Sequence, residues 1–312
     1  MDSMKALKGR DFLSLHDFTP DEVMGLVALG LDLKAKQKAG IPHPYLQGKT
    51  LGMIFEKSST RTRLAFEVGM YQLGGHALFL SPRDIQLGRG ETIADTARVL
   101  SRMVDGIMIR TFGHDIVEEM AKWADVPVIN ALTDLLHPTQ VVADLMTIRE
   151  HRGVIKGQKL VFVGDGNNMA HSLLFGGAKT GMHVTVACPE GYEPNAEVLA
   201  KAKKDAEETG AVISVSHDPF EAAKDADILY TDVWASMGEE AQAEEKESHF
   251  KQYQINAELL AAAKADALVL HCLPAKRGKE ITEDVLEGPH SVVFDEAENR
   301  LHAHKAILAA LL

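Results

Sequence analysis

The sequence predicts an α/β protein built from two doubly wound parallel-sheet domains. Short apolar segments of strand length alternate with longer segments of helical periodicity in both halves of the chain, a pattern typical of βαβ units. A chain of 312 residues corresponds to about two domains of ordinary size. A helix that begins near Pro138 and ends at Gly153 is long enough to join them.

Composition and charge restrict the class of protein. The hydrophobic content of 46% and the charged content of 25% are those of an ordinary globular protein. The net charge of -12 argues against broad binding of nucleic acids or anionic membranes. Two cysteines cannot form a disulfide framework, and no apolar run reaches the roughly 18 residues of a membrane helix. The charged N-terminal stretch also lacks the apolar centre of a signal peptide, so we expect a cytoplasmic protein.

The first half of the chain opens with a clear helix start. Thr19 is the expected N-cap, Pro20 takes the first helical position and Glu22 completes a capping box. Strands are expected at 50–55, 76–80, 107–110 and 126–129. Helices are expected near 64–73, 93–104 and 115–123. We assign residues 1–147 to this first domain.

The second half repeats the alternation. Strands are expected at 160–163, 184–187, 212–215, 228–230, 268–270 and 292–294. The polar, Glu-rich segment 234–253 lacks clear periodicity and is expected to form a long loop. The second domain is assigned to 148–295. The C-terminal segment, about 296–312, is expected to form a helix that packs back on the first domain.

The segment Ser59-Thr60-Arg61-Thr62-Arg63 lies at a strand-to-helix turn. The backbone N–H groups at a helix N-terminus have no partner inside the helix, and the macrodipole places partial positive charge there. Hydroxyl groups and an arginine beside them make a site suited to a phosphate dianion. The alternative is an ordinary capped helix with two solvated arginines.

Polar residues follow several of the expected strands, where parallel sheets bind ligands. In the first domain these are Arg110 and His137-Pro138-Thr139-Gln140. In the second domain they are Asn167-Asn168, Asp232 and His271-Cys272-Leu273-Pro274. Together with the Ser59–Arg63 segment, the first group supplies phosphate ligands, a cation and an imidazole. The second group supplies an amide, a carboxylate and a thiol, which suit a zwitterionic, amino-acid-like ligand. We therefore expect two substrates to meet in a cleft.

Two nucleotide-binding patterns fail. Gly48-Lys49-Thr50 resembles the end of a P-loop, but His43 stands where that motif needs glycine. Gly164-Asp165-Gly166 follows a strand, but Met169 replaces the third glycine of a dinucleotide fingerprint. Nicotinamide binding is therefore disfavoured.

Several single residues have a structural interpretation as an alternative to a functional one. His137 could be only a neighbour of a helix N-cap, and Cys272 could be a buried small hydrophobe. His302 and His304 are expected at the surface. Because histidine, cysteine and acidic residues do not occur at metal-ligand spacings, we expect no structural zinc.

Four segments together resemble the signature set of the carbamoyltransferase family, its ornithine branch in particular. They are Ser59-Thr60-Arg61-Thr62-Arg63, His137-Pro138-Thr139-Gln140, Asp232-Val233-Trp234-Ala235-Ser236-Met237-Gly238 and His271-Cys272-Leu273-Pro274. The resemblance covers essentially the whole chain and includes Glu296-Ala297-Glu298-Asn299-Arg300. The first two segments imply carbamoyl phosphate, and the last two point to ornithine rather than aspartate.

The resemblance implies a role for each matching residue. Carbamoyl phosphate would be bound by Ser59, Thr60, Arg61, Thr62, Gln86, Arg110, His137, Gln140, Cys272, Leu273 and Arg300. Ornithine would be bound by Asn168, Asp232, Ser236 and Met237. The catalytic residues would be Cys272, Arg110, His137 and Asp232.

The expected reaction transfers the carbamoyl group of carbamoyl phosphate to the δ-amine of ornithine and yields citrulline and phosphate. It needs no metal and no organic cofactor. The resemblance also implies a homotrimer or an assembly of trimers. The alternatives are a carbamoyltransferase for a related amine, such as putrescine or an N-acylated ornithine, and a catalytically silent binding relative.

Overall fold

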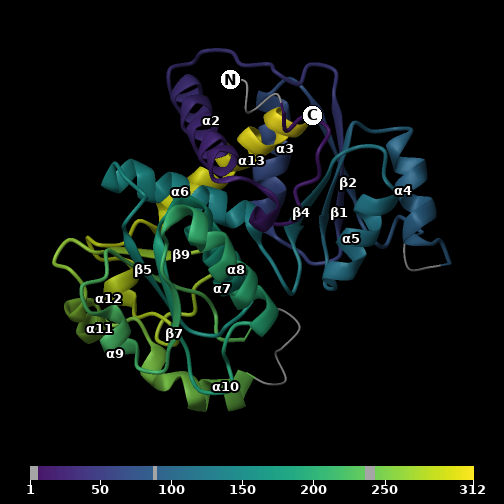
Figure 1. The fold of residues 1–312 in the computed structure, drawn as a ribbon. Coiled ribbons are helices and arrows are strands. Elements are labelled where there is room, and N and C mark those ends of the chain that lie inside the picture. Colours follow the sequence, from purple (N-terminus) through teal and green to yellow (C-terminus); the bar gives the residue numbers. More distant parts are fainter. Residues whose placement is uncertain (1–5, 87–89, 236–242) are drawn as a thin grey trace. The chain divides into compact units, whose positions relative to one another are not determined.

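The computed structural model describes residues 6–86, 90–235 and 243–312 (Figure 1). The chain divides into two compact units. Unit 1 comprises Met1–Met146 and Glu298–Leu312, and unit 2 comprises Thr147–Ala297. The boundaries fall inside two helices, α6 (Pro138–Arg152) and α13 (Val293–Leu311). Each of these helices therefore contributes residues to both units.

Unit 1 contains a four-stranded parallel sheet with the order β2-β1-β3-β4. Its strands are β1 (Thr50–Phe55), β2 (His76–Leu80), β3 (Gly106–Arg110) and β4 (Val128–Leu132). Strands β3 and β4 are buried along their whole length, as expected of apolar strands covered on both faces. Because neighbouring β1 and β3 lead to crossovers on opposite sides, their carboxyl ends form a switch point where ligands bind.

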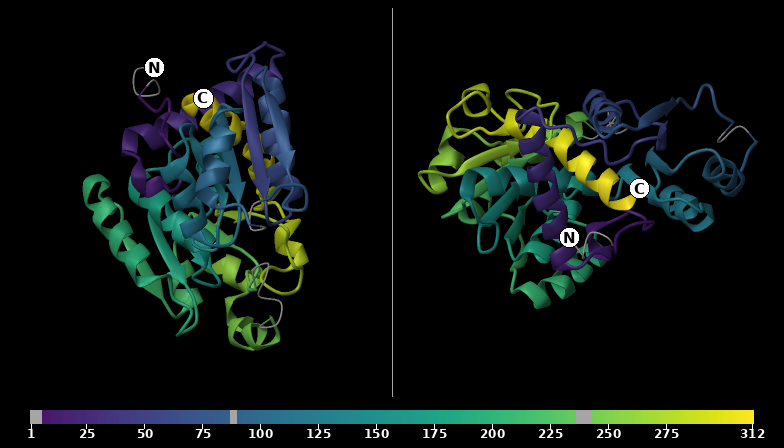
Figure 2. Two further views of the ribbon diagram at one scale, coloured as in Figure 1. Left: turned by 90° about the vertical axis from the view of Figure 1, so that its right-hand side faces the viewer. Right: turned by 90° about the horizontal axis from the view of Figure 1, so that it is seen from above.

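Helices cover both faces of this sheet. Figure 1 shows α4 (Ile93–Ser101) and α5 (His114–Trp123) on one side, and α3 (Thr60–Gln72) and α13 on the other. Helix α2 (Pro20–Lys38), preceded by the short helix η1 (Leu15–Asp17), lies beside α13 in the views of Figure 2. The buried Lys34 Nζ donates to Asn299 Oδ1 at 2.8 Å across these two helices.

Unit 2 contains a five-stranded parallel sheet with the order β7-β6-β5-β8-β9. Its strands are β5 (Lys159–Val163), β6 (His183–Ala187), β7 (Ile213–Ser216), β8 (Ile228–Thr231) and β9 (Leu268–His271). The order reverses between β5 and β8, so this sheet also has a switch point. The first turn of helix α7 and the residues after β8 and β9 lie at the same edge.

Two helices, α7 (Asn168–Thr180) and α8 (Ala196–Thr209), cover one face of this sheet (Figure 1). The other elements of unit 2 are α9 (Pro219–Ala223), α10 (Ala243–Phe250), η3 (Lys251–Tyr253), α11 (Ala257–Ala262) and α12 (Glu283–Leu286). Their apolar side chains pack with those of β5 and β9 in one buried cluster. None of the helices in the described ranges is both long and apolar enough to cross a membrane.

The predicted fold class is confirmed, because two parallel α/β sheets are present and the C-terminal helix packs on unit 1. Three local expectations are wrong. The segment 234–253 is not a continuous loop, since α10 and η3 lie within it. Residues 293–294, expected to end a strand, instead begin α13. His302 and His304 are fully buried rather than exposed.

Helix α10 is fixed to unit 2 by an ion pair and an aromatic contact. Lys246 Nζ donates to Asp165 Oδ2 at 2.7 Å, and the two side chains are only 9% and 13% exposed. Phe250, at the end of the helix, stacks on Trp234 with ring centroids 5.9 Å apart. These contacts explain why α10 forms in a stretch that lacks helical periodicity.

We expect Lys246→Met to destabilise unit 2 by about 3 kcal/mol or more, because Asp165 would keep a buried charge without its partner. Urea unfolding followed by tryptophan fluorescence measures the change, in a Trp123→Phe background where Trp234 is the remaining tryptophan. The matched control is Lys279→Met, which breaks a pair of equal length with Glu247 whose side chains are 45% and 39% exposed. We expect this control to change stability little. Equal losses in both variants would contradict the argument from burial.

Candidate active site

The N-terminus of α3 in unit 1 carries the predicted phosphate site. Ser59 is the N-cap, and its Oγ accepts a hydrogen bond from the backbone N–H of Thr62 at 3.2 Å. The Ser59 hydroxyl also lies 3.1 Å from Thr62 Oγ1. Thr62 is fully buried, whereas Thr60 is exposed and Arg61 half-buried. The helix start therefore presents hydroxyl groups, a guanidinium and backbone donors together.

Arg300 joins this helix start to α6. Its Nη2 donates to Thr62 Oγ1 at 2.9 Å, and its Nη1 donates to Gln140 Oε1 at 2.7 Å. Gln140 Nε2 in turn donates to Asp144 Oδ1 at 2.8 Å. All four side chains are buried. Residues far apart in the sequence thus form one hydrogen-bonded chain, and they include three of the predicted carbamoyl phosphate ligands.

Arg110 and His137 belong to the same part of unit 1. Arg110 is the last residue of β3, and His137 directly precedes α6. Burial, followed by the positive charges of Arg300 and Arg110, lowers the pKa of His137 well below its ordinary value. His304 and Arg61 act in the same direction. The His137 imidazole is therefore neutral at pH 7 and can donate an N–H to an uncharged acceptor.

Gln86 is separate from this group. It is exposed, just before residues 87–89, which lie outside the described ranges. No hydrogen bond joins it to another described residue. The structure therefore gathers Ser59, Thr62, Arg110, His137, Gln140 and Arg300 but not Gln86.

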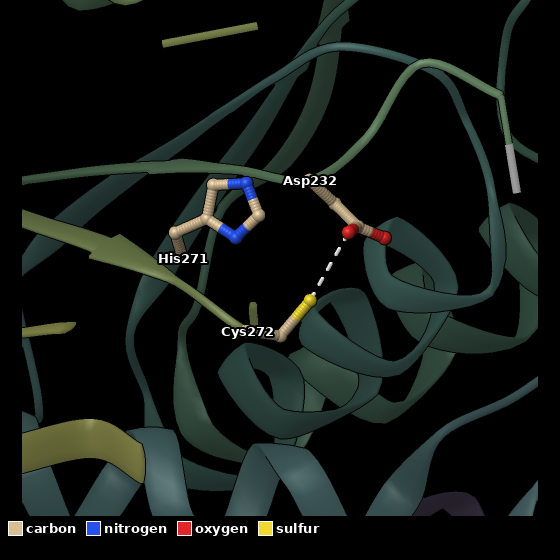
Figure 3. A group of neighbouring side chains, drawn as sticks. All are labelled: Asp232, His271 and Cys272. Carbon is tan, nitrogen blue, oxygen red and sulfur yellow. Dashed lines mark hydrogen bonds between the residues drawn. The ribbon is translucent and has the colours of Figure 1, made fainter. Parts of the chain in front are cut away.

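Asp232 is the centre of the predicted site in unit 2 (Figure 3). Its Oδ1 accepts from Cys272 Sγ at 3.1 Å and from the backbone N–H of Val233 at 2.8 Å. Its Oδ2 accepts from Asn167 Nδ2 at 3.1 Å. Asn167 also caps α7 by accepting from the N–H groups of Met169 and Ala170. The carboxylate, the thiol and the helix N-terminus are thereby held together.

His271 holds the segment that follows β9. Its Nδ1 accepts from the backbone N–H of Leu273 at 2.8 Å, so Nε2 carries the proton and donates to Glu280 Oε1 at 3.1 Å. Leu273 has a φ of 57°, a left-handed conformation that is strained for a residue with a side chain. The buried His271–Glu280 pair fixes this backbone and with it the position of Cys272.

The ligand atoms of Asp232, His271 and Cys272 lie within 4.8 Å of one another and could in principle hold a metal ion. Each is already engaged, because both His271 nitrogens and the Cys272 thiol make the hydrogen bonds described above. A cation would have to replace those bonds. Among the described residues this is the one such cluster found.

The other predicted residues of unit 2 differ in how far they can be placed. Asn168 is the first residue of α7 and is half-buried. Ser236 and Met237 lie outside the described residues. The second cysteine, Cys188, is fully buried, and this burial raises the pKa of its thiol to about 12, which leaves it unreactive at neutral pH.

Sequence reasoning missed the roles of several supporting residues. Asn167 was named together with Asn168, but only Asn168 was given a role, although the place of Asn167 before a helical segment is typical of an N-cap. Glu280 belongs to no motif, and Glu296 belongs to the resembling segment 296–300 but was given no role. Glu296 accepts from the Tyr230 hydroxyl and from the backbone N–H of His271, at 3.0 and 2.9 Å. The glycines of the turn at 164–166 also have a structural reason, since a Cβ at Gly166 would lie 2.3 Å from Pro194 N.

Comparisons with known proteins identify the family of both halves of the chain. Residues 10–150 match the carbamoyl-P binding domain of aspartate/ornithine carbamoyltransferases, and residues 156–311 match their Asp/Orn binding domain. An ornithine carbamoyltransferase of Halalkalibacterium halodurans is 60% identical over 307 residues, 98% of this chain and 96% of the relative. That of Pyrococcus abyssi is 58% identical and covers 98% and 97%.

Solved structures show the same likeness. The ornithine carbamoyltransferase from Pyrococcus furiosus has a TM-score of 0.95 and 57% identity, covering 98% of this chain and 97% of that one. An anabolic ornithine carbamoyltransferase from Campylobacter jejuni has a TM-score of 0.90 and 46% identity, with coverage of 96% and 97%. This chain belongs to the aspartate/ornithine carbamoyltransferase family.

Proposed function

We infer that this chain is an ornithine carbamoyltransferase, which transfers the carbamoyl group of carbamoyl phosphate to the δ-amine of L-ornithine and releases L-citrulline and phosphate. The observation that carries this assignment is the likeness over nearly the whole chain to proteins named ornithine carbamoyltransferase, at 58–60% identity. The intact polar groups of both units support catalysis rather than a silent binding role.

We propose that residues 1–147, with the C-terminal helix, bind carbamoyl phosphate. The phosphate would be held by the α3 N-terminus with Ser59, Thr60, Arg61, Thr62 and Arg300. Arg110 and His137 would donate to the carbonyl oxygen, and Gln140 would contact the carbamoyl nitrogen. The buried Arg300–Thr62–Gln140 contacts support this part of the proposal, because they place a fixed positive charge at a helix N-terminus. Gln86 is proposed on family resemblance alone.

We propose that residues 148–295 bind ornithine. Asp232 and Asn168, with Ser236 and Met237, would hold its amino-acid end. Cys272 and Leu273 would lie where the δ-amine meets the carbamoyl carbon. The support is the hydrogen-bonded group of Asp232, Cys272 and Asn167, which presents a carboxylate and a thiol at one sheet edge.

The chemistry follows from these groups. Attack of the δ-amine on the carbonyl carbon produces a tetrahedral intermediate with a developing oxyanion, and Arg110, His137 and Thr62 are donors able to stabilise it. Because the His137 imidazole is neutral, it would donate its N–H to the oxyanion without adding a positive charge to the site. The C–O bond to the phosphate then breaks, the surplus proton of the attacking nitrogen passes to the leaving phosphate, and the α3 N-terminus and the Arg61 guanidinium stabilise the negative charge of that leaving group. The amine must be deprotonated before attack, and desolvation beside cations lowers its pKa.

We also propose that the chain forms a homotrimer or a multiple of trimers. Edge strand β2 and the outer side of α3 expose apolar side chains, namely Leu64, Tyr71, Leu78 and Phe79, of which Tyr71 is 81% exposed. The Arg63 guanidinium lies 4.0 Å from the centroid of the Phe79 ring. An apolar patch on an edge strand is typical of a surface covered by another chain.

We further propose a cytoplasmic location and a role in arginine biosynthesis. The first is supported by the cysteine content, because two cysteines cannot form a disulfide framework. The second is supported by a 56%-identical relative from Pyrococcus furiosus that is named an anabolic ornithine carbamoyltransferase.

The direct test is product formation from carbamoyl phosphate with four amines in parallel: ornithine, putrescine, N-acetylornithine and aspartate. We expect turnover with ornithine and little with putrescine or N-acetylornithine, because Asp232 suits a free α-amino acid. We expect little turnover with aspartate, because the segments 232–238 and 271–274 resemble those of the ornithine branch. Turnover only with another amine would keep the carbamoyl phosphate assignments and overturn the role of Asp232. No turnover with any amine would favour the silent relative.

We expect Arg110→Met to lower kcat by about 100- to 1000-fold, the usual cost of losing one oxyanion donor. The measurement is steady-state citrulline formation. Arg102→Met is the control, because it removes the same charge from an exposed position of unit 1. If both variants lose activity equally, the effect comes from net charge and not from a donor at the reacting carbonyl.

We expect iodoacetamide to modify Cys272 and leave Cys188 unmodified at pH 8. Cys272 is partly exposed, whereas the Cys188 thiol is buried with a pKa of about 12. Peptide mass spectrometry identifies the labelled residue, with Cys272→Ser and Cys188→Ser as controls. Ornithine added in phosphate buffer should slow the labelling. Labelling that is indifferent to ornithine would place Cys272 away from the amine.

A further inference from the structure

Two pairs of residues face each other where α13 packs on α3 in unit 1. Arg300 and His304 lie one turn apart on α13, and Thr62 and Phe66 lie one turn apart on α3. Arg300 Nη2 donates to Thr62 Oγ1, and the His304 ring stacks on the Phe66 ring with centroids 4.2 Å apart and an interplanar angle of 22°. The two contacts tie the helices together at successive turns.

The Arg300 guanidinium uses all three of its nitrogens within unit 1. Nη1 and Nη2 donate to Gln140 and Thr62, and Nε donates to His304 Nε2 at 3.4 Å. The third contact is the longest and therefore the weakest, but it is the one of the three that engages Nε. Without an acceptor at Nε, the guanidinium plane could still rotate about the line that joins its two other acceptors, Gln140 Oε1 and Thr62 Oγ1.

This contact determines the state of the His304 ring. Arginine only donates, so Nε2 must carry a lone pair and the proton must be on Nδ1. Burial and the charge of Arg300 lower the pKa of His304 well below its ordinary value, and the ring stays neutral. A cationic imidazole here would repel Arg300.

Packing alone does not favour histidine at this position. His304 is fully buried, and its Nδ1 has no hydrogen-bond partner among the described residues. An unpaired buried N–H costs free energy that a phenylalanine or leucine would not. The stack on Phe66 would also be available to a phenyl ring. The one feature that requires an imidazole is the acceptor for Arg300.

We propose that His304 is a positioning residue that orients the Arg300 guanidinium for the phosphate of carbamoyl phosphate. The inference rests on the proposed function, because it assigns Arg300 to that phosphate. His304 itself touches no substrate. It acts by limiting the orientations of the Arg300 guanidinium, because the hydrogen bonds of this group to a phosphate depend on the direction of its N–H groups.

The test compares His304→Phe, which keeps the ring stack but removes the acceptor, with His304→Gln, whose side-chain amide oxygen can reach the position of Nε2. We expect His304→Phe to lower kcat/KM for carbamoyl phosphate by about 10- to 100-fold and to leave KM for ornithine unchanged. His304→Gln should recover most of the loss. Urea unfolding checks that His304→Phe remains folded, and we expect its stability to change little, because the variant loses the unpaired Nδ1–H of His304 but leaves the Arg300 Nε–H without its acceptor.

The matched control is His302→Phe. His302 is an equally buried histidine on the same helix, but its Nε2 lies 3.7 Å from Glu298 Oε1 instead of near Arg300. This control should keep the kinetic constants of the parent. Unchanged kcat/KM in His304→Phe, or an equal loss in His302→Phe, would overturn the proposal.

A second measurement separates this inference from the proposed function. Titration calorimetry with inorganic phosphate reports on the anion site even if no amine is carbamoylated. Weaker phosphate binding by His304→Phe than by the parent supports the positioning role whatever the reaction is. Equal affinities would refute it, and a parent chain that binds phosphate but makes no citrulline would refute only the proposed function.

Discussion

The structure of unit 1 depends on accommodating a buried arginine. Arg300 is only 3% exposed, and a buried guanidinium is tolerated only where its donors find acceptors. Those acceptors come from α3, α6 and α13 itself, so the three helices must meet at the carboxyl edge of the sheet. The return of the C-terminal helix to the first half of the chain follows from this requirement as much as from its apolar residues.

In unit 2 a buried carboxylate, that of Glu296, likewise joins several elements. Glu296 fixes β8 and β9 through the Tyr230 hydroxyl and the backbone N–H of His271. His271 then holds the strained backbone of Leu273, which determines where Cys272 lies. Cys272 is therefore positioned by buried residues that hold the backbone on either side of it, and hydrogen bonds in this buried region offset the cost of the strained backbone.

The sequence was most informative where the physical signal is local. Alternating apolar segments predicted both sheets, and the hydroxyl-rich turn at Ser59 predicted the start of α3, because strands and helix N-termini are encoded within a few neighbouring residues. Long-range partners could not be predicted in this way. His304 was expected at the surface because nothing near it in the sequence reveals Arg300 as its partner, and α10 was missed because it is held by Asp165, far away in the chain.

Helix α13 shows why such long-range hydrogen-bond partners cannot be predicted from each residue and its neighbours in the sequence. Glu296 and Arg300 lie one turn apart on this helix, yet the first belongs to unit 2 and the second to unit 1. A single stretch of five residues therefore serves two separate hydrogen-bonded networks. Its sequence resembles an ordinary polar helix, because each side chain is explained only by groups on other elements. We expect a substitution at 296–297 to affect unit 2 and one at 298–300 to affect unit 1, because the boundary between the units falls between Ala297 and Glu298.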